Sequence, residues 1–344
     1  SINEHFIADH KGYLDFDLIR YLKNNIDLKF GTLEEWSSIN NFIRESDFSL
    51  NVNYEEALNR IDIENFSNLQ ALIICSEYRS WGWGASVFRE RIHTGKWEWT
   101  IWDMDRAFTN VNWNGFTYLN DTTGLEAPNA FAFQLLKNDQ FKYDYINRIS
   151  DFLNTHFKPE NLIAKIDSLE NILEADIVFE ADRWNRTVAT WENNISLLRS
   201  FASNRPNIVR QQLINYFSLE GSSELSITSN EGGSIKVNSV LIHESPFNGI
   251  YFKNIPISLE AIPLPGYVFD RWISDDDFET NPIIIDIDSD ILNVSAVFLP
   301  LNIDNELEII SPSISLTDDF HPLVFKYYDQ GSLRMNNEPI KGHL

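Results

Sequence analysis

Cysteine, basic residues and long apolar runs are all scarce in this sequence, and each shortage excludes some types of protein. The 344 residues include one cysteine, Cys75, so no disulfide can form within the chain. We expect Cys75 to be a small buried apolar residue. Lysine and arginine number 27 against 51 aspartates and glutamates. The resulting net charge of -24 argues against nucleic acid as the main partner, because phosphate binding needs a basic surface.

Several familiar sequence signals are also missing. No apolar run approaches the length of a membrane span. The chain starts at Ser1 without a methionine or a signal sequence, so we expect it to be a processed or excised piece of a longer protein. The seven histidines form no metal-like pair at i, i+4, and no GxGxxG, Walker-type loop or GxSxG is present. The common nucleotide-binding and hydrolase motifs therefore do not explain this chain.

The residues that are present predict an α+β protein with two regions that differ in their pattern of apolar and polar residues. Hydrophobic content of 43% indicates a globular chain, long enough for two domains. Residues 1–221 read mostly as helix, including about the first 60, and residues 222–300 read as short strands separated by Gly, Asn and Pro. Residues 301–344 stay unassigned and could begin a truncated further module.

Three helices in the first region have recognisable starts. Asp62 is the expected N-cap of one helix. Its buried face should consist of apolar residues at helical spacing: Phe66, Leu69, Leu72 and Ile73. Pro159 predicts a second start, followed by an apolar stripe of Leu162, Ile163, Ile166, Leu169, Ile172 and Leu173. Pro206 predicts a third start, with Gly221 just past its end.

A hairpin should interrupt these helices. "ASVFRERI" predicts one strand, "HTGK" a four-residue turn and "WEWTIWD" the return strand. Asp103 and Asp105 follow, two residues apart, so they would share one face if the strand continues through residue 105. Two carboxylates at such a short separation repel each other unless a cation such as Mg²⁺ lies between them. Alternatively, because Asp at a strand end is common in turns, Asp105 could pair with Arg106 or cap the next segment.

The tryptophans beside these aspartates allow two interpretations. Trp97 and Trp99 should share a strand face. With Trp81, Trp83 and Trp113 nearby they could form a stacking platform for a sugar or a base, or an aromatic core. We favour the core.

The segment "GKWEWTIWDMDRAF" resembles the signature of the CotH (spore coat protein H) kinase family, in which a Trp-rich strand runs into D-x-D and an aromatic residue. "IDIENFSNLQALIICSEY" resembles the preceding family helix. "LLKNDQFKYDYINRISDFLNTHFKPENLIAKIDSL" and "FASNRPNIVRQQLINYFSL" resemble the family's C-terminal helices, in the same order. The resemblance covers about residues 5–220.

This resemblance implies a kinase-like lobe over residues 1–221 and phosphoryl transfer from ATP to protein, with Asp103 and Asp105 holding Mg²⁺ and nucleotide. Two departures stand against activity. The family's catalytic Asp and Asn positions fall on Ser80 and Gly84, so the catalytic residues are unknown. The nucleotide-covering N-terminal lobe, with its lysine, also has no clear counterpart.

Residues 222–300 resemble a divergent InlB-type B-repeat of bacterial surface proteins. The residues that carry this are "GGSIKV", "ISLEAIPLPGYVFDRW", "NP" and "NVSAVF", with the Gly266, Tyr267, Phe269 and Trp272 cluster as its strongest part. We expect these aromatics to be core residues. Together the two resemblances imply a secreted or cell-surface bacterial protein whose partner is a protein substrate or a surface protein.

Three functions stay open on the sequence. The first is Mg²⁺-dependent protein phosphorylation, and the second is a catalytically degenerate relative that binds a partner or serves as a scaffold. The third is a carbohydrate-binding surface protein, which requires Trp97 and Trp99 to be exposed.

Overall fold

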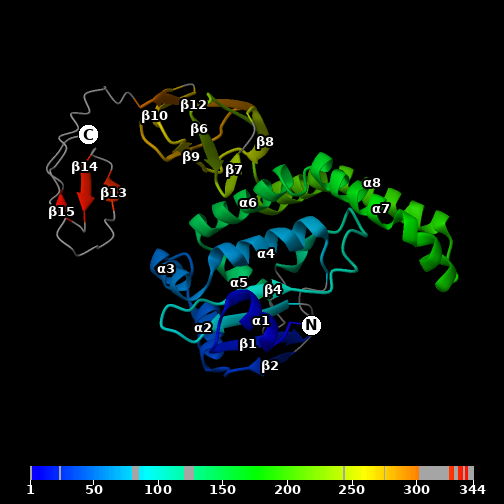
Figure 1. Cartoon of the computed structure of the whole chain (residues 1–344). Helices are drawn as coiled ribbons and strands as arrows, with labels where there is room; N and C mark the ends of the chain where they lie inside the picture. Colours follow the sequence, from blue (N-terminus) through cyan, green and yellow to red (C-terminus); the bar gives the residue numbers. More distant parts are fainter. Residues whose placement is uncertain are drawn as a thin grey trace, which may run out of the picture. The chain divides into compact units, whose positions relative to one another are not determined.

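The computed structural model describes residues 2–22, 25–79, 85–119, 128–242, 245–274 and 276–301, and the backbone of strands 325–328, 332–335 and 338–339 (Figure 1). Two compact units contain them, Ser1–Leu299 and Pro300–Leu344, and each is described by itself. The first unit mixes helices with antiparallel sheets and ends in a β module, so the predicted α+β class is confirmed.

A four-stranded antiparallel sheet forms the N-terminal part of the first unit, in the order β2-β1-β3-β4. Its strands are β1 (Phe16–Leu22), β2 (Asn25–Phe30), β3 (Ala85–Glu90) and β4 (Glu98–Ile101). The predicted hairpin is therefore confirmed as β3 and β4. The expectation that the first 60 residues are helical is wrong for residues 16–30. Strand β1 lies between two neighbours and buries Phe16, Leu18 and Ile19 in succession, so it lacks the alternation that marks a half-buried strand.

Helices cover this sheet and continue beyond it. They are α1 (Glu4–Lys11), α2 (Glu34–Glu45), α3 (Asn51–Arg60), α4 (Ile63–Ser76), η1 (Gly115–Tyr118), α5 (Pro128–Leu135), α6 (Asp139–Asn154), α7 (Pro159–Arg183) and α8 (Val188–Phe217). The central helix α4 starts where predicted, because the Asp62 side chain accepts a hydrogen bond from the backbone N–H of Asn65 at 2.9 Å. Phe66, Leu69 and Ile73 are buried and Leu72 is half-buried, so the predicted face is confirmed.

Aromatic side chains from distant segments fill the core beneath α4. Trp36 stacks on Phe131 with ring centroids 5.5 Å apart and meets Trp97 edge-on at 5.1 Å. Trp99 packs against Phe66 at 4.9 Å. Such pairs stabilise a core beyond the area that they bury, and here they attach strand β4 to α2, α4 and α5.

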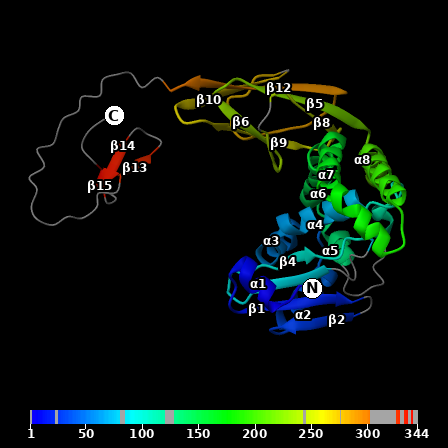
Figure 2. The same ribbon diagram turned by 45° about the vertical axis from the view of Figure 1, so that its right-hand side comes forward.

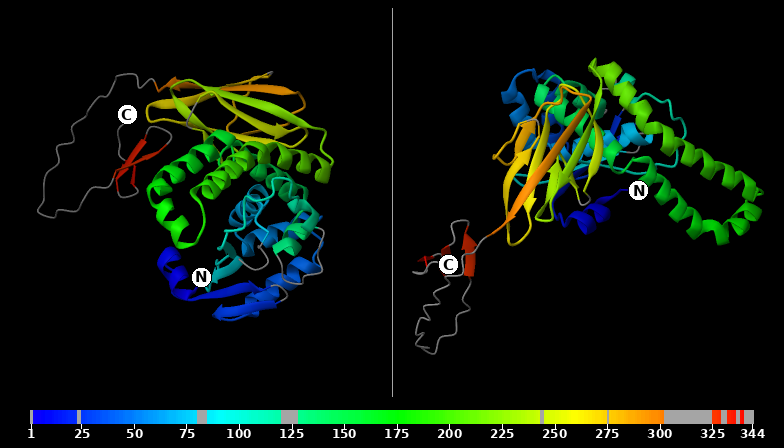
Figure 3. Two further views of the ribbon diagram at one scale, coloured as in Figure 1. Left: turned by 90° about the vertical axis from the view of Figure 1, so that its right-hand side faces the viewer. Right: turned by 90° about the horizontal axis from the view of Figure 1, so that it is seen from above.

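The long helices α7 and α8 pack side by side as a hairpin (Figures 1 and 3). Pro159 occupies the first turn of α7 as predicted. The prediction for Pro206 is wrong, because it lies inside α8, whose N-cap is Thr187. An interior proline normally costs about 3 kcal/mol, and the buried neighbour Arg205 supplies the tertiary bonds that offset it, as described below.

The β module consists of two four-stranded sheets, ordered β10-β12-β5-β8 and β11-β9-β6-β7. Its strands are β5 (Ser222–Ser229), β6 (Gly233–Val237), β7 (Val240–Ile242), β8 (Phe247–Phe252), β9 (Ile257–Pro263), β10 (Tyr267–Ile273), β11 (Ile283–Ile285) and β12 (Ile291–Pro300). Both sheets contribute to one apolar core, and β12 pairs with β5 in parallel. Trp272 is fully buried there, with Tyr267 and Phe269 packed against the core, so the expectation that these aromatics are core residues is confirmed.

Helix α6 lies beside strand β8 of the β module (Figure 2). Its contacts to the module come from polar side chains one or two turns apart. The Asn147 amide donates to the carbonyl of Pro256 at 2.7 Å. The Asp151 carboxylate accepts hydrogen bonds from the hydroxyls of Ser239 and Tyr251. Asn154 bonds both the N–H and the carbonyl of Ile250. Residues four and three apart share one helix face, so a single face of α6 makes all these contacts.

In the second unit, β13 (Phe325–Tyr328), β14 (Ser332–Met335) and β15 (Glu338–Pro339) form an antiparallel sheet in that order. Whether it begins a further module stays a prediction.

Candidate functional site

The two aspartates lie beyond the end of β4 rather than on it. The strand ends at Ile101, and Asp103 and Asp105 belong to an irregular segment that follows. Asp103 has φ +63°, in the left-handed region that breaks strand geometry. The strand therefore does not run through residue 105, so strand alternation does not determine how the two carboxylates are placed. Both side chains are nevertheless exposed, so their oxygens are accessible to a ligand.

Hydrogen bonds on either side fix the segment that carries these aspartates. Before Asp103, the Tyr78 hydroxyl donates to the carbonyl of Trp102 at 2.7 Å. After Asp105, the backbone N–H of Phe108 donates to the carbonyl of Ser76 at 2.9 Å. Ser76 and Tyr78 adjoin the C-terminus of α4, so the aspartate segment is anchored at both ends to one rigid helix.

Glu77 lies between Ser76 and Tyr78 in the sequence and also attaches the aspartate segment to α4. It is fully buried, and its φ of +62° ends α4 in a left-handed cap. Its carboxylate accepts hydrogen bonds from the backbone N–H groups of Thr109 and Asn110 and from the guanidinium of Arg79. A buried carboxylate is stabilised only when such donors satisfy it. Glu77 therefore acts as a structural anchor, and its oxygens are occupied within the chain.

Arg205 of α8 joins the same region from the other side. Its fully buried guanidinium donates to the carbonyls of Val111 and Trp113, both at 2.7 Å, and to those of Ile74 and Cys75. Burial lowers the pKa of Arg205 to about 10, so the side chain keeps its charge at neutral pH. These bonds tie α8 to the end of α4 and to the segment after the aspartates.

The negative charges of the aspartates affect the pKa of Tyr78. Burial, followed by the negative charges of Asp103 and Asp105, raises the pKa of Tyr78 to about 12. The hydroxyl therefore stays protonated and keeps donating to Trp102. The ring of Trp102 makes a cation–π contact with Arg20, whose guanidinium lies 4.4 Å from the ring centre.

Asp103 and Asp105 are the two exposed carboxylates that this segment would offer to a metal ion. Among the described residues, no group of three or more His, Cys, Asp or Glu side chains could hold a metal. Mg²⁺ commonly binds through only one or two carboxylates and completes its shell with water and substrate phosphates. A site of that kind would use Asp103 and Asp105 together with oxygens of the bound ligand. Ser80 and Gly84, the predicted counterparts of the family's catalytic positions, lie outside the described residues, as do Trp81 and Trp83.

The tryptophan platform is excluded as a sugar site. Trp97 is 1% exposed and Trp99 is 3% exposed, and both belong to the core. Trp113 is buried as well. A carbohydrate ring needs an accessible aromatic face, so the prediction of carbohydrate binding through Trp97 and Trp99 is wrong and the core interpretation is confirmed.

Cys75 is fully buried as predicted, and burial raises the pKa of its thiol to about 12, so it is no nucleophile.

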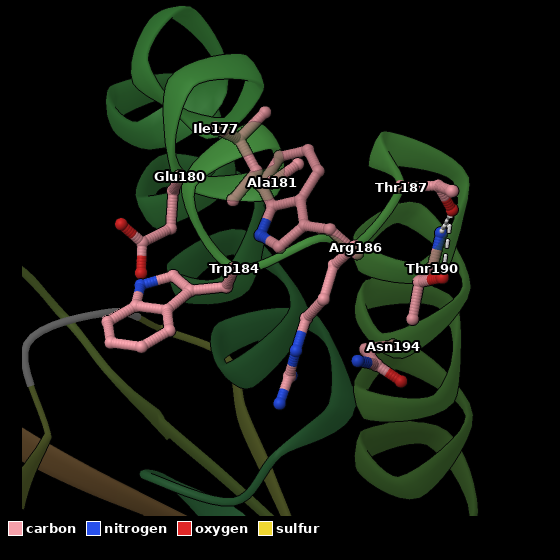
Figure 4. A pocket seen from close by; sticks show the side chains of 9 residues that line it. Ile177, Glu180, Ala181, Trp184, Arg186, Thr187, Thr190 and Asn194 are labelled. Atoms are coloured by element: carbon pink, nitrogen blue, oxygen red, sulfur yellow. Dashed lines mark hydrogen bonds between the residues drawn. The ribbon is translucent and has the colours of Figure 1, made fainter.

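A cavity of about 460 Å³ lies at the end of the α7–α8 hairpin (Figure 4). Trp184, Ile177 and Ala181 line it together with Arg186, and Thr187 bonds Thr190 at its rim. Glu180 is the only carboxylate among its lining residues. The cavity is mainly apolar and lacks a pair of acids, so it does not resemble a site for phosphoryl chemistry.

Sequence reasoning identified Asp103 and Asp105 but missed the residues that position them. Tyr78 and Arg205 gave no local signal in the sequence, because their hydrogen-bond partners are distant backbone carbonyls. Tyr78 bonds the carbonyl of residue 102, and Arg205 bonds carbonyls between residues 74 and 113, among them those of Ile74 and Trp113.

The sequence model of the family described as "CotH kinase protein" matches residues 13–209, more than half of the chain. No curated protein matches the chain. In the described part of the chain, no helix is both long and apolar enough to cross a membrane.

Proposed function

Because this chain belongs to the CotH kinase protein family, we propose that it binds ATP with Mg²⁺ at Asp103 and Asp105 and transfers a phosphoryl group to a protein. The observation that carries the proposal is the anchoring of the aspartate segment. Two exposed carboxylates project from a backbone held to α4 on both sides, at Trp102 and at Phe108. Preorganised charge of this kind is what phosphoryl transfer requires of a protein.

The chain's own residues would act by binding and orientation. Asp103 and Asp105 would supply carboxylate oxygens to the ion, which when bound neutralises the negative charge of the phosphates. Tyr78 stays protonated and holds the Trp102 carbonyl, which fixes the backbone before Asp103. Glu77 holds the backbone after Asp105 through Thr109 and Asn110.

Calorimetric titration of the chain with ATP and Mg²⁺ tests this proposal. The Asp103→Asn variant removes one ligand charge, and Asp176→Asn is the matched control because Asp176 is exposed on α7. We expect Mg²⁺-dependent ATP binding in the wild-type chain and in Asp176→Asn, and its loss in Asp103→Asn. If the wild-type chain does not bind ATP, or if both variants behave alike, the assignment of the carboxylates is wrong.

A second candidate is a degenerate relative that binds a partner, or nucleotide, without catalysis. The hydrogen bonds of Glu77 favour it, since this carboxylate, three residues before Ser80 in the sequence, is buried and accepts hydrogen bonds from Thr109, Asn110 and Arg79. It cannot serve as a base for a substrate hydroxyl. Incubation with labelled ATP and protein acceptors separates the candidates: transfer that requires Asp103 supports the kinase, and Mg²⁺-dependent binding without transfer supports the degenerate relative.

The β module supports a proposal about location. We propose that residues 222–300 are an InlB-type B-repeat and that the protein is secreted or attached to the bacterial surface. In support, Gly266 has φ +87° at the turn before β10, and Trp272 lies at the centre of a two-sheet core. Protease treatment of intact producing cells tests the location, because a surface protein is digested while a cytoplasmic control survives.

A further inference from the structure

A basic cavity lies at the turn between β3 and β4, where β4 begins, whereas Asp103 follows the other end of that strand. Ile61 and Trp97 pair here as a short parallel bridge, in which the N–H of Trp97 donates to the carbonyl of Arg60 at 2.9 Å. Ile61 and Trp97 are both buried in the core. The residues just before them, Arg60 and Lys96, both line the cavity instead. The pairing therefore brings two cationic side chains to one wall.

Arg89, near the end of β3 beside the turn, adds a third cationic group. Arg89 of β3 donates to the carbonyls of Gly95 and Ile92, both at 3.0 Å, which holds the turn against its strand. His93 and Thr94 complete the rim. Because Arg89 is fixed by two bonds, its charge is held at this cavity at little further entropic cost.

These cationic side chains lack anionic partners. None of Arg60, Arg89 and Lys96 lies within 4 Å of a carboxylate among the described residues. Glu35 and Glu56 line the same cavity but pair with none of them. In a chain with 51 acidic residues and 27 lysines and arginines, three neighbouring lysine and arginine side chains without a carboxylate partner are unexpected. Grouped like charges repel unless an anion lies between them.

We propose that this cavity binds a phosphate monoester, carried by a phosphorylated peptide side chain or by a small molecule. A phosphate monoester bears nearly two negative charges and three acceptor oxygens at neutral pH, which suits several donors better than a single carboxylate does. The guanidinium of Arg89 already donates to Gly95 and Ile92, and that of Arg60 donates to Ser38, so a phosphate would accept from their remaining N–H groups and from the ammonium group of Lys96. The cavity volume of about 550 Å³ exceeds that of a bare ion and leaves room for the group to which the phosphate is attached.

The test is a calorimetric titration of the whole chain with a phosphoserine peptide, its unphosphorylated form and inorganic phosphate. Lys96→Gln removes one charge from an exposed side chain, and Lys165→Gln on α7 is the matched control. We expect the chain to prefer the phosphorylated peptide. Lys96→Gln should weaken that binding at least fivefold, Lys165→Gln should weaken it less than twofold, and added salt should weaken it in all variants.

The remaining comparisons identify the source of the phosphate and separate this site from the aspartates. Inorganic phosphate that competes on equal terms indicates a small-molecule ligand, and much weaker competition indicates a peptide. Asp103→Asn should leave phosphopeptide binding unchanged, because Asp103 lies beyond the opposite end of β4. Equal binding of the two peptides, or equal losses in Lys96→Gln and Lys165→Gln with unchanged thermal unfolding, overturns the proposal.

Discussion

Replacing Glu77 by alanine should loosen the anchor of the aspartate segment without touching the aspartates. The substitution leaves the backbone N–H groups of Thr109 and Asn110 without their acceptor. We therefore expect two effects in Glu77→Ala: a lower free energy of unfolding, and weaker Mg²⁺-dependent ATP binding than in the wild-type chain. Glu77→Gln keeps an acceptor oxygen but no charge, so its effects should be intermediate.

The size of the stability loss follows from the contacts. A hydrogen bond to a charged group contributes about 1.5–3 kcal/mol, so the two backbone donors account for roughly 3–6 kcal/mol. The variant no longer buries a carboxylate, and this offsets part of the loss. The Arg79 pair adds little, because that side chain is 47% exposed. The net expectation for Glu77→Ala is about 3 kcal/mol, and about 1–2 kcal/mol for Glu77→Gln.

Urea unfolding followed by circular dichroism measures this difference. Glu64→Ala is the control on the same helix, since its side chain is 71% exposed and pairs with Arg148 at 3.4 Å. Its cost should stay within about 0.5 kcal/mol. If Glu77→Ala costs no more than Glu64→Ala, the anchoring role is refuted. If Glu77→Gln abolishes phosphoryl transfer while stability is unchanged, Glu77 is instead a base in the reaction.

Three further predictions concern buried groups. Arg205→Leu should lower the free energy of unfolding by about 3–5 kcal/mol in the same urea assay, because four buried carbonyls lose their donor; a loss below 1 kcal/mol would contradict this role. Burial raises the pKa of Asp151 from 3.8 to about 6. The contribution of protonated Asp151 to the free energy of unfolding is therefore complete below about pH 4 and is lost as pH rises through 6. Between pH 4 and 7 the wild-type chain should lose up to about 3 kcal/mol of this free energy relative to Asp151→Asn. Parallel pH profiles of the two chains would refute this. Cys75 should react with a thiol reagent only after unfolding, since it is buried with a raised pKa, and rapid labelling of the native chain would show otherwise.

Long-range contacts explain why the site was only partly predictable. Asp103 and Asp105 were found from their spacing and from the neighbouring tryptophans, but their geometry depends on Asp103 in the left-handed region, which a strand pattern does not reveal. Tyr78 bonds Trp102, 24 residues along the chain. Arg205 bonds Ile74, 131 residues away. No local pattern encodes pairs at such distances.

The sequence by itself determined the features that depend on near neighbours. These are helix α4 with its Asp62 cap, the β3–β4 hairpin, the start of α7 at Pro159 and the alternating strands of the β module, all of which arise from capping, turns and periodicity. Tertiary structure decided the rest. Strand β1 is buried on both faces, so it carries no alternation, and Pro206 stays within α8 beside an arginine that four carbonyls satisfy. Where burial and distant hydrogen bonds outweigh local preference, only the assembled fold shows which conformation is stable.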